Sequence, residues 1–402
     1  MTKVQQLIIF INNFSLGIIA PVLNLILLER GADLKTLPLI MALYSVTVLC
    51  FELPSGICAD LYGRKTVFLL SCGFQVLSLA LLLLANNMIC LIFAIIFNGV
   101  SRSFSSGSLD ALIIDQAVTN HGEECLPKIT SRLAILDQIG LAAGGIAGGI
   151  IAYISSTNLT NIVLRIGFTV VVFVLCLLFI TEVQRYQHLE ERIPLSEHLQ
   201  NGKKVLFSVP IFKFIFMGVF FIGFFIMTIE TYWQSAFLGV TTLANSTWIL
   251  GIITFIGYMA AASGNTISLR LLQKFRTHHW RVYIISQFIL CLCIVILALQ
   301  RNSFGFILGY AGIYMLLGLG NVATSSLLNQ YTPSQIRASV LSLSSFLLQV
   351  GAMCASIFSS IMVSRLEIGG VWLVAGILIG GYALLTTSLS YIRKRRQQLG
   401  KS

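Results

Sequence analysis

The sequence predicts an all-α integral membrane protein with twelve transmembrane helices in two halves of six. Its 402 residues are 56% hydrophobic and 10% charged, with a mean hydropathy of +0.89. A soluble domain carries about 25% charged residues, so this composition cannot build a surface that faces water throughout. Apolar runs of 18 or more residues recur along the chain, and each can cross a hydrocarbon core of about 30 Å. We expect each to be helical, because backbone polar groups in lipid must be satisfied internally.

The predicted spans follow one another along the whole chain. They fall near residues 4–28, 36–59, 66–85, 88–117, 130–154, 160–181, 209–239, 244–269, 280–299, 303–328, 335–363 and 367–392.

The longest polar stretch interrupts this series once. It predicts a cytoplasmic linker at 183–208, between a six-helix half at 1–182 and a second half at 209–402 with a basic tail. Two helical halves around a linker are typical of transporters, whose substrate sites lie near the bilayer midplane between the halves.

The positions of the basic residues predict the orientation in the membrane. With both termini in the cytoplasm, inside connections hold 20 Lys and Arg. Outside connections then hold five, namely Arg30, Lys35, Arg165, Arg301 and Arg365, and Arg102 alone lies within a span. This bias predicts a multi-pass protein of the cell membrane with cytoplasmic termini. It also accounts for the net charge of +11 without nucleic-acid binding.

Several chemistries find no support in the sequence. It has no phosphate-binding G-x-x-x-x-G-K-[ST] element and no zinc-ligand spacing, and its five histidines fall in predicted cytoplasmic connections. No nucleophile–base arrangement appears. We therefore expect no cofactor, no metal site and no enzymatic activity.

A charged motif closes the second predicted span. Its members are Gly56, Asp60, Gly63, Arg64 and Lys65, in the pattern G-x-x-x-D-x-x-G-R-K. This pattern resembles the loop signature of the major facilitator superfamily, in which the loop latches the halves in the outward-facing state. We expect Gly56 to admit a neighbouring helix closely and Gly63 to permit a tight turn. The alternative is an ordinary short basic loop.

A glycine run in the fifth predicted span also resembles that superfamily. Gly140, Gly144, Gly148 and Gly149 match a G-x-x-x-G-P-x-x-G-G pattern associated with its antiporters, with Gly145 in the place of proline. Gly140, Gly144 and Gly148 share one helix face, so we expect a helix from the other half to pack there. A general small-residue packing seam is the alternative.

The fourth predicted span is similar to that of bacterial drug-exporter-like members. It reads "SGSLDALIID" and includes Arg102, followed by Gly107. The resemblance implies a major facilitator fold and a bacterial, monomeric transporter that exchanges small organic compounds or drugs for protons. The second half keeps less of the loop signature, since Ser268 replaces the aspartate.

Ionisable residues inside predicted spans are site candidates, because each is costly in lipid unless paired or hydrated. Glu52, Asp110 and Asp137, together with Arg102, are the candidates for proton coupling. Glu52 has an equal alternative as a structural hydrogen-bond acceptor near Pro54. We expect Asp60 and Asp115, at cytoplasmic ends, to be structural.

The candidates for substrate contact lie in other spans. Glu230 stands beside Tyr232, Trp233 and Gln234, which suits an amphipathic or cationic ligand. An aromatic belt at the outer headgroups explains the same residues. The amides of Asn12, Asn13 and Gln349 contact substrate or tie helices together.

The leading functional hypothesis is a secondary transporter that exports small organic compounds in exchange for protons. A proton-coupled importer of a metabolite is the alternative within transport. A membrane sensor or scaffold that no longer moves substrate is the alternative outside it.

Overall fold

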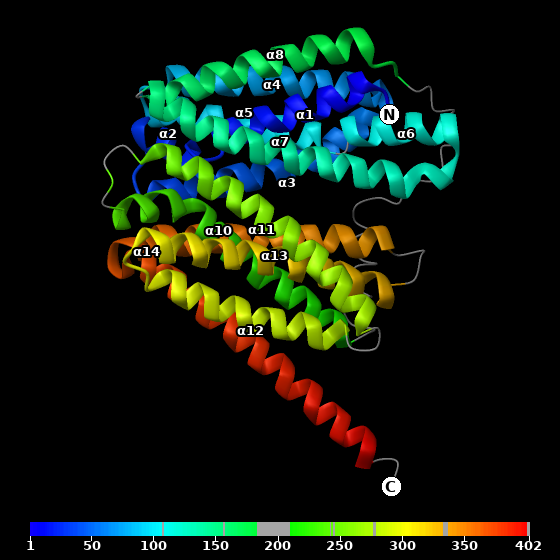
Figure 1. Ribbon diagram of the computed structural model, residues 1–402, viewed down its shortest axis with the longest axis vertical. Helices are drawn as coiled ribbons and strands as arrows, with labels where there is room; N and C mark the ends of the chain where they lie inside the picture. The colour runs from blue at the N-terminus through cyan, green and yellow to red at the C-terminus, as the bar shows by residue number, and fades with distance from the viewer. Residues whose placement is uncertain are drawn as a thin grey trace. The chain divides into compact units, whose positions relative to one another are not determined.

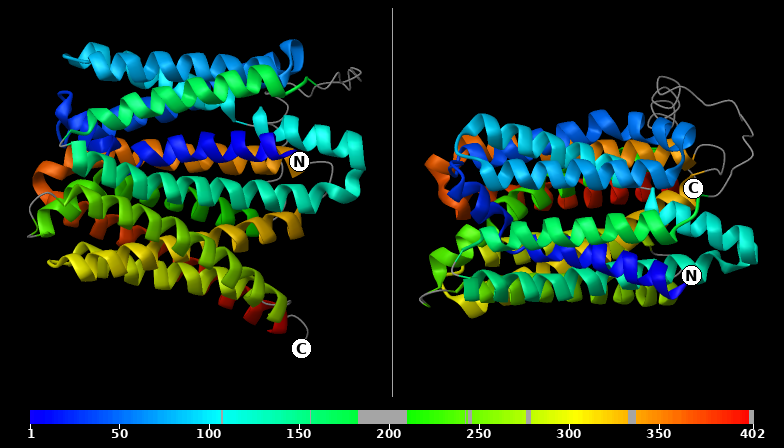
Figure 2. Two further views of the ribbon diagram at one scale, coloured as in Figure 1. Left: turned by 45° about the horizontal axis from the view of Figure 1, so that its top comes forward. Right: turned by 90° about the horizontal axis from the view of Figure 1, so that it is seen from above.

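The computed structural model describes residues 1–402 except 107, 156, 183–209, 242, 244–245, 276–278, 333–336 and 400–402. The predicted linker at 183–208 lies wholly outside the described residues. Described secondary structure is helical throughout, as Figures 1 and 2 show. The elements are α1 (Lys3–Ile19), α2 (Leu23–Glu29), α3 (Thr36–Tyr62), α4 (Arg64–Leu84), α5 (Met88–Ser105), α6 (Leu109–His121), the short 3₁₀ helix η1 (Glu123–Cys125), α7 (Leu126–Ser155), α8 (Leu159–Phe179), α10 (Pro210–Val240), α11 (Thr247–Lys274), α12 (His279–Ala298), α13 (Ser303–Tyr331) and α14 (Arg337–Leu399).

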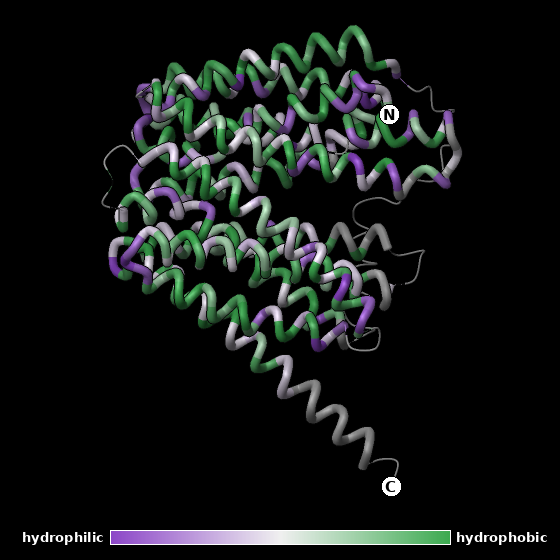
Figure 3. The backbone as a smooth tube through the Cα atoms, in the orientation of Figure 1, coloured by the Kyte–Doolittle hydropathy of each residue, from purple (hydrophilic) through white to green (hydrophobic). Residues whose placement is uncertain are grey.

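The all-α membrane class predicted from composition is confirmed. Among the described residues, nine helices are long and apolar enough to cross a membrane, or ten when α1 and α2 are taken as one bent span. Figure 3 shows apolar residues along the helices and polar residues gathered toward many of their ends. The predicted count of twelve is not fully shown by these helices.

Two predicted spans are broken. The run 4–28 forms α1 and α2, bent by 47° around Ala20–Val22. Pro21 accounts for the break, because proline lacks a backbone donor and clashes with the preceding turn. The run 88–117 forms α5 and α6, with Ser106 in an extended conformation at the end of α5. Serine side chains there bond to backbone carbonyls, which competes with helix continuation.

Local sequence signals set several helix starts. Thr2 begins α1 with a reciprocal pair of hydrogen bonds to Gln5, a capping box. Asn87 and Asn302 cap α5 and α13 through their side-chain oxygens. The helix α14 covers two predicted spans, 335–363 and 367–392. Its backbone departs from helical geometry at Glu367, with φ +57°, where the second of these spans begins.

The described chain forms two compact units. The first comprises residues 1–188 and 241–259, and the second comprises 189–240 and 260–402. In the first unit α1 packs against α7 and α8, and α4 packs against α5 and α8. In the second unit α10 packs against α14, and α12 packs against α13 and α14. Each unit has apolar clusters between its helices.

Candidate functional site

The first unit contains a cavity of about 640 Å³. This volume lies within the range of about 300–1,000 Å³ that is usual for small-molecule sites. Its wall is rich in polar side chains, including five amides and six hydroxyl groups of serine and threonine. Its charged side chains are Arg102, Asp110, Asp137 and Arg165. The structure therefore brings three of the four proton-coupling candidates to one place.

Helix ends position two of these charges. Arg102 lies in the last turn of α5, and Asp110 lies in the first turn of α6. The partial charges at helix ends favour a cation at the C-terminus and an anion at the N-terminus. The break between α5 and α6 thus stabilises opposite charges on the same cavity wall.

Asp137 is held by a partner on another helix. Its Oδ1 accepts a hydrogen bond of 2.6 Å from Nδ2 of Asn13, which also donates to the carbonyl of Ile9 at 3.0 Å. Asn13 therefore ties α1 to α7, one of the two roles expected for it. Because both side chains also line the cavity, Asn13 has access to a ligand there.

Arg165 is a correction to the sequence prediction. The distribution of basic residues predicts an outside connection for Arg165, but it lies within α8, is 5% exposed and lines the cavity. Its position five residues past the start of an apolar helix was the signal that could have identified it. The lengths of apolar runs alone do not show whether a cation near a helix end reaches solvent or turns inward.

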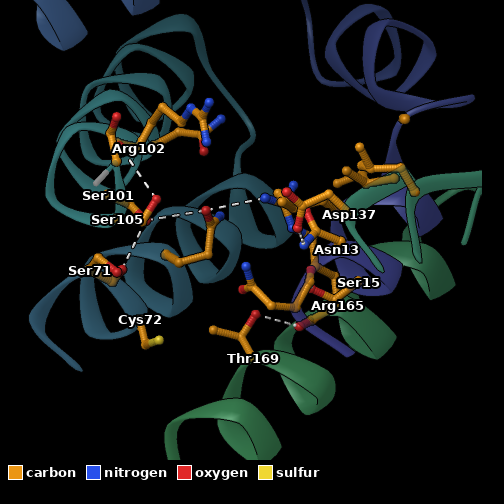
Figure 4. Close-up of a pocket in the computed structure, with 18 of the residues that line it drawn as sticks. Asn13, Ser15, Ser71, Cys72, Ser101, Arg102, Ser105, Asp137, Arg165 and Thr169 are labelled. Carbon is orange, nitrogen blue, oxygen red and sulfur yellow. Dashed lines mark hydrogen bonds between the residues drawn. The ribbon is translucent and has the colours of Figure 1, made fainter. Parts of the chain in front are cut away.

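A hydrogen-bond chain connects Arg165 to the opposite wall. Its Nη2 donates to Oε1 of Gln75 at 3.2 Å, and the hydroxyl of Ser101 approaches the same oxygen at 3.3 Å. Ser101 also donates to the carbonyl of Ser71 at 2.8 Å. Figure 4 shows Ser71, Ser101 and Arg102 on one side of the view, and Asn13, Asp137 and Arg165 on the other.

Three buried polar atoms in this wall have no hydrogen-bond partner among the described residues: Nε of Arg165, Nε2 of Gln75 and Oε1 of Gln138. Unsatisfied buried polar groups are uncommon in folded proteins, since each costs about 1–3 kcal/mol. Water or a ligand in the cavity would satisfy them.

Two faces of α7 pack differently, which corrects a second expectation. Gly140, Gly144 and Gly148 face α1 of the same unit rather than a helix of the predicted second half, and the Cα of Ile18 lies 2.9 Å from where a Cβ of Gly148 would be. Gly145 and Gly149 face α11 instead, with the Cα of Gly251 2.7 Å from the corresponding Cβ position of Gly149. Glycine allows both backbone approaches.

The turn between α3 and α4 contains part of the predicted latch. Gly63 has φ +88°, a conformation that favours glycine. Arg64 forms an ion pair of 2.9 Å with Asp115 on α6. The carboxylate of Glu182 accepts from the backbone nitrogens of Arg64 and Lys65 at 3.1 and 2.8 Å, a partner that the motif did not reveal.

Two members of the latch motif are not part of this network as described. No heavy atom of the described residues lies within 4 Å of the Cβ position of Gly56, so none of them makes the close approach expected there. Asp60 belongs to α3, but its side chain lies outside what the structure describes.

Other candidates lie away from the cavity. Glu52 is exposed on α3, and Gln349 is half-buried on α14; neither lines the cavity. In the second unit Glu230 accepts a hydrogen bond from the hydroxyl of Tyr314. Tyr232, Trp233 and Gln234 are at most 2% exposed, and Trp233 packs on Tyr310 with ring centroids 5.1 Å apart. This cluster belongs to the second unit, whereas the cavity residues belong to the first.

Comparison with known proteins gives a consistent family. The model of the Major Facilitator Superfamily matches residues 7–331. YxaM of Bacillus subtilis (strain 168), described as an uncharacterized MFS-type transporter, is 24% identical over 381 residues, covering 92% of this chain and 91% of YxaM.

Solved structures show a similar fold. A mutant of the nucleoside transporter NupG aligns with a TM-score of 0.80 and 14% identity, covering 96% of this chain and 98% of NupG. Another NupG structure aligns with a TM-score of 0.77 at the same identity, covering 96% and 99%. At this identity the likeness concerns the fold alone.

Proposed function

This chain belongs to the Major Facilitator Superfamily, and we propose that it is a secondary active transporter that moves a small polar organic compound in exchange for protons. The observation that carries this proposal is the cavity of the first unit, which places four charged side chains and unsatisfied polar atoms inside an apolar helix bundle. Such groups are costly in a membrane and mark substrate or ion pathways.

We propose Asp137 and Asp110 as the proton carriers, with Arg102 as the cation that modulates them. All three line the same cavity, so a change in hydration or in distance from Arg102 would change the proton affinity of either acid. Glu52 ranks lower, because it is exposed on α3 outside the cavity. Glu230 remains a candidate for substrate contact rather than proton transfer.

We propose that the compound is exported, because the glycine run of α7 resembles the pattern associated with antiporters. We also propose cytoplasmic termini and a cell-membrane location from the distribution of basic residues, and a monomer as the functional unit. The turn at Gly63–Lys65 is the proposed latch, supported by the bonds of Arg64 and Lys65 to Asp115 and Glu182.

Import of a polar metabolite is the second candidate. It is favoured by the abundance of amide and hydroxyl groups in the cavity, which suits a polar solute better than a hydrophobic drug. Nucleosides, transported by NupG, belong in the same test panel.

Reconstituted vesicles with a pH-sensitive dye in the lumen test the function and its direction together. A compound added outside and carried inward by an antiporter drives protons out, so the lumen becomes alkaline. A symporter makes the lumen acidic. The panel contains nucleosides, sugars, amino acids, organic acids and lipophilic cations, and an Asp137→Asn protein provides the comparison. The absence of proton movement and of uptake for the whole panel would favour the sensor or scaffold alternative.

A further inference from the structure

We propose that the transported compound carries a single carboxylate, which binds to the guanidinium of Arg165 and the side-chain amide of Gln75. This inference rests on the proposed transport function and names its substrate class.

Arg165 is a buried cation without a counter-ion in the part of the chain that the structure describes. It is 5% exposed, and no described carboxylate pairs with it. Among the described residues, its guanidinium has one hydrogen bond, to the neutral amide oxygen of Gln75, and its Nε has no acceptor. A buried charge without an opposite charge is strongly unfavourable, so an anion bound in the cavity would stabilise Arg165.

Arg30 shows another way in which this fold compensates the charge of an arginine, although its Nε, like that of Arg165, has no partner among the described residues. Its guanidinium donates to the carbonyls of Leu83 and Ala85, at the C-terminal end of α4. That helix end carries a partial negative charge, which compensates the cation. Arg165 lies in the second turn of α8, near the start of that helix and not at a C-terminal end, and it lines the cavity instead.

Gln75 supplies the second donor. Its Oε1 faces the guanidinium of Arg165 and the hydroxyl of Ser101, and this arrangement leaves its Nε2 as a donor without an acceptor. The two free N–H groups therefore belong to side chains that are bonded to each other. A guanidinium with a neighbouring amide donor matches the two oxygens of a carboxylate.

The acids in the same cavity limit the class further. Asp110 and Asp137 would repel a ligand with several negative charges. A monocarboxylate whose remainder is neutral or cationic would bind Arg165 through its carboxylate and would not add negative charge near Asp110 and Asp137.

Thermal unfolding of the purified full-length protein in detergent tests the site with minimal probes. Formate and acetate are compared with formamide and acetamide, their neutral analogues, at constant ionic strength, and with sodium chloride. We expect the two acids to raise the unfolding temperature saturably and the amides to have little effect. Chloride as effective as acetate would mean an inorganic anion site and would overturn the proposal, as would acetate no better than acetamide.

Three variants locate the effect. Arg165→Gln should weaken acetate binding by about tenfold to a hundredfold, the usual contribution of a hydrogen bond to a charged group. Gln75→Glu places a carboxylate where Oε1 already meets Arg165, so it should stabilise the free protein and abolish the acetate response. Arg301→Gln, at an exposed arginine outside the cavity, should respond as the original protein does. An unchanged acetate response in Arg165→Gln would overturn the proposal, and Gln75→Glu decides alone if Arg165→Gln does not fold.

Transport measurements separate this inference from the proposed function. If substrates drive proton movement without any preference for acids over their amides, the transport function is supported and the carboxylate site is contradicted. If acetate stabilises the protein in an Arg165-dependent way but no compound is transported, the carboxylate site is supported and the transport function is contradicted.

Discussion

The two units handle their embedded polar groups in different ways. In the first unit, charged side chains from α5, α6, α7 and α8 line one cavity. Buried polar atoms without a partner among the described residues occur in both units, so the difference lies in the charged groups. In the second unit, Glu230 is bonded to Tyr314, whose ring packs on Tyr310 with centroids 4.5 Å apart. Tyr283 and Tyr382 likewise pair through their hydroxyls at 3.1 Å. This difference is the reason for assigning the proposed binding and coupling chemistry to the first unit, and for expecting the tyrosines of the second unit to stabilise its packing.

Neutralising Asp137 should have the largest effect on transport. If protons are carried in the first unit, Asp137→Asn should abolish accumulation driven by a pH gradient while exchange of substrate across the membrane continues, because exchange need not move a proton. Counterflow and gradient-driven uptake in the same vesicles measure the two activities. Full gradient-driven transport in Asp137→Asn and in Asp110→Asn would show that the cavity acids are structural.

Close packing at glycine should contribute to stability in both units. In the first unit it should also affect ligand binding in the cavity. Gly148→Ala sets a Cβ against the backbone of Ile18, and Gly223→Ala sets one against the backbone of Leu348 in the second unit. Each should lower the free energy of unfolding by about 1–3 kcal/mol, as overpacking does. Only Gly148→Ala should also weaken ligand binding, since α1 and α7 carry Asn13 and Asp137.

Gly167→Ala is the matched control for these two variants. No described heavy atom lies within 4 Å of its Cβ position on α8, so it should be neutral or stabilise the helix by up to about 1 kcal/mol. Thermal unfolding of the three purified variants provides the comparison. If Gly167→Ala lost as much stability as the other two variants, close backbone approach would not be the reason for glycine at positions 148 and 223.

The tyrosine contact of the second unit should affect stability more than coupling. Tyr314→Phe removes the hydrogen bond to Glu230 and should cost about 1 kcal/mol, the usual size of a polar contact between membrane helices. Proton coupling should survive in Tyr314→Phe and in Glu230→Gln. If Glu230→Gln uncouples transport as Asp137→Asn is expected to do, the division of roles between the units is wrong.

The smallest effect is expected at Asp33, an acid of the first unit outside the membrane spans. The backbone N–H and hydroxyl of Thr36 bond to its carboxylate, and they hold the pKa of Asp33 below its usual value. A lowered pKa contributes stability at pH values above the unfolded value of about 3.9, and this contribution is lost as the pH falls through the folded value. Asp33→Asn should remove that slight acid dependence of unfolding and leave transport unchanged.

Some local features follow directly from short stretches of sequence. Thr2 with Gln5 and the asparagines at 87 and 302 begin helices through contacts with residues three positions away. The turn at Gly63 needs a conformation that glycine adopts easily. The break at Pro21 also follows from the local sequence, because proline disrupts a helix. The apolar run at 4–28 predicts a single span only if this effect of proline is neglected.

The composition by itself determined the class of this protein, because so few charged residues cannot solvate a surface and long apolar runs can only be helices in lipid. The motifs also indicated the superfamily. Which side chains meet was decided by the tertiary structure alone. Arg165, Gln75 and Ser101 stand on three helices and are joined through one amide oxygen. The face of α7 with Gly140, Gly144 and Gly148 meets α1, whereas Gly149 meets α11, a helix of the predicted second half. Periodicity shows that a face is small or polar, but the choice of its partner depends on how all the helices pack together.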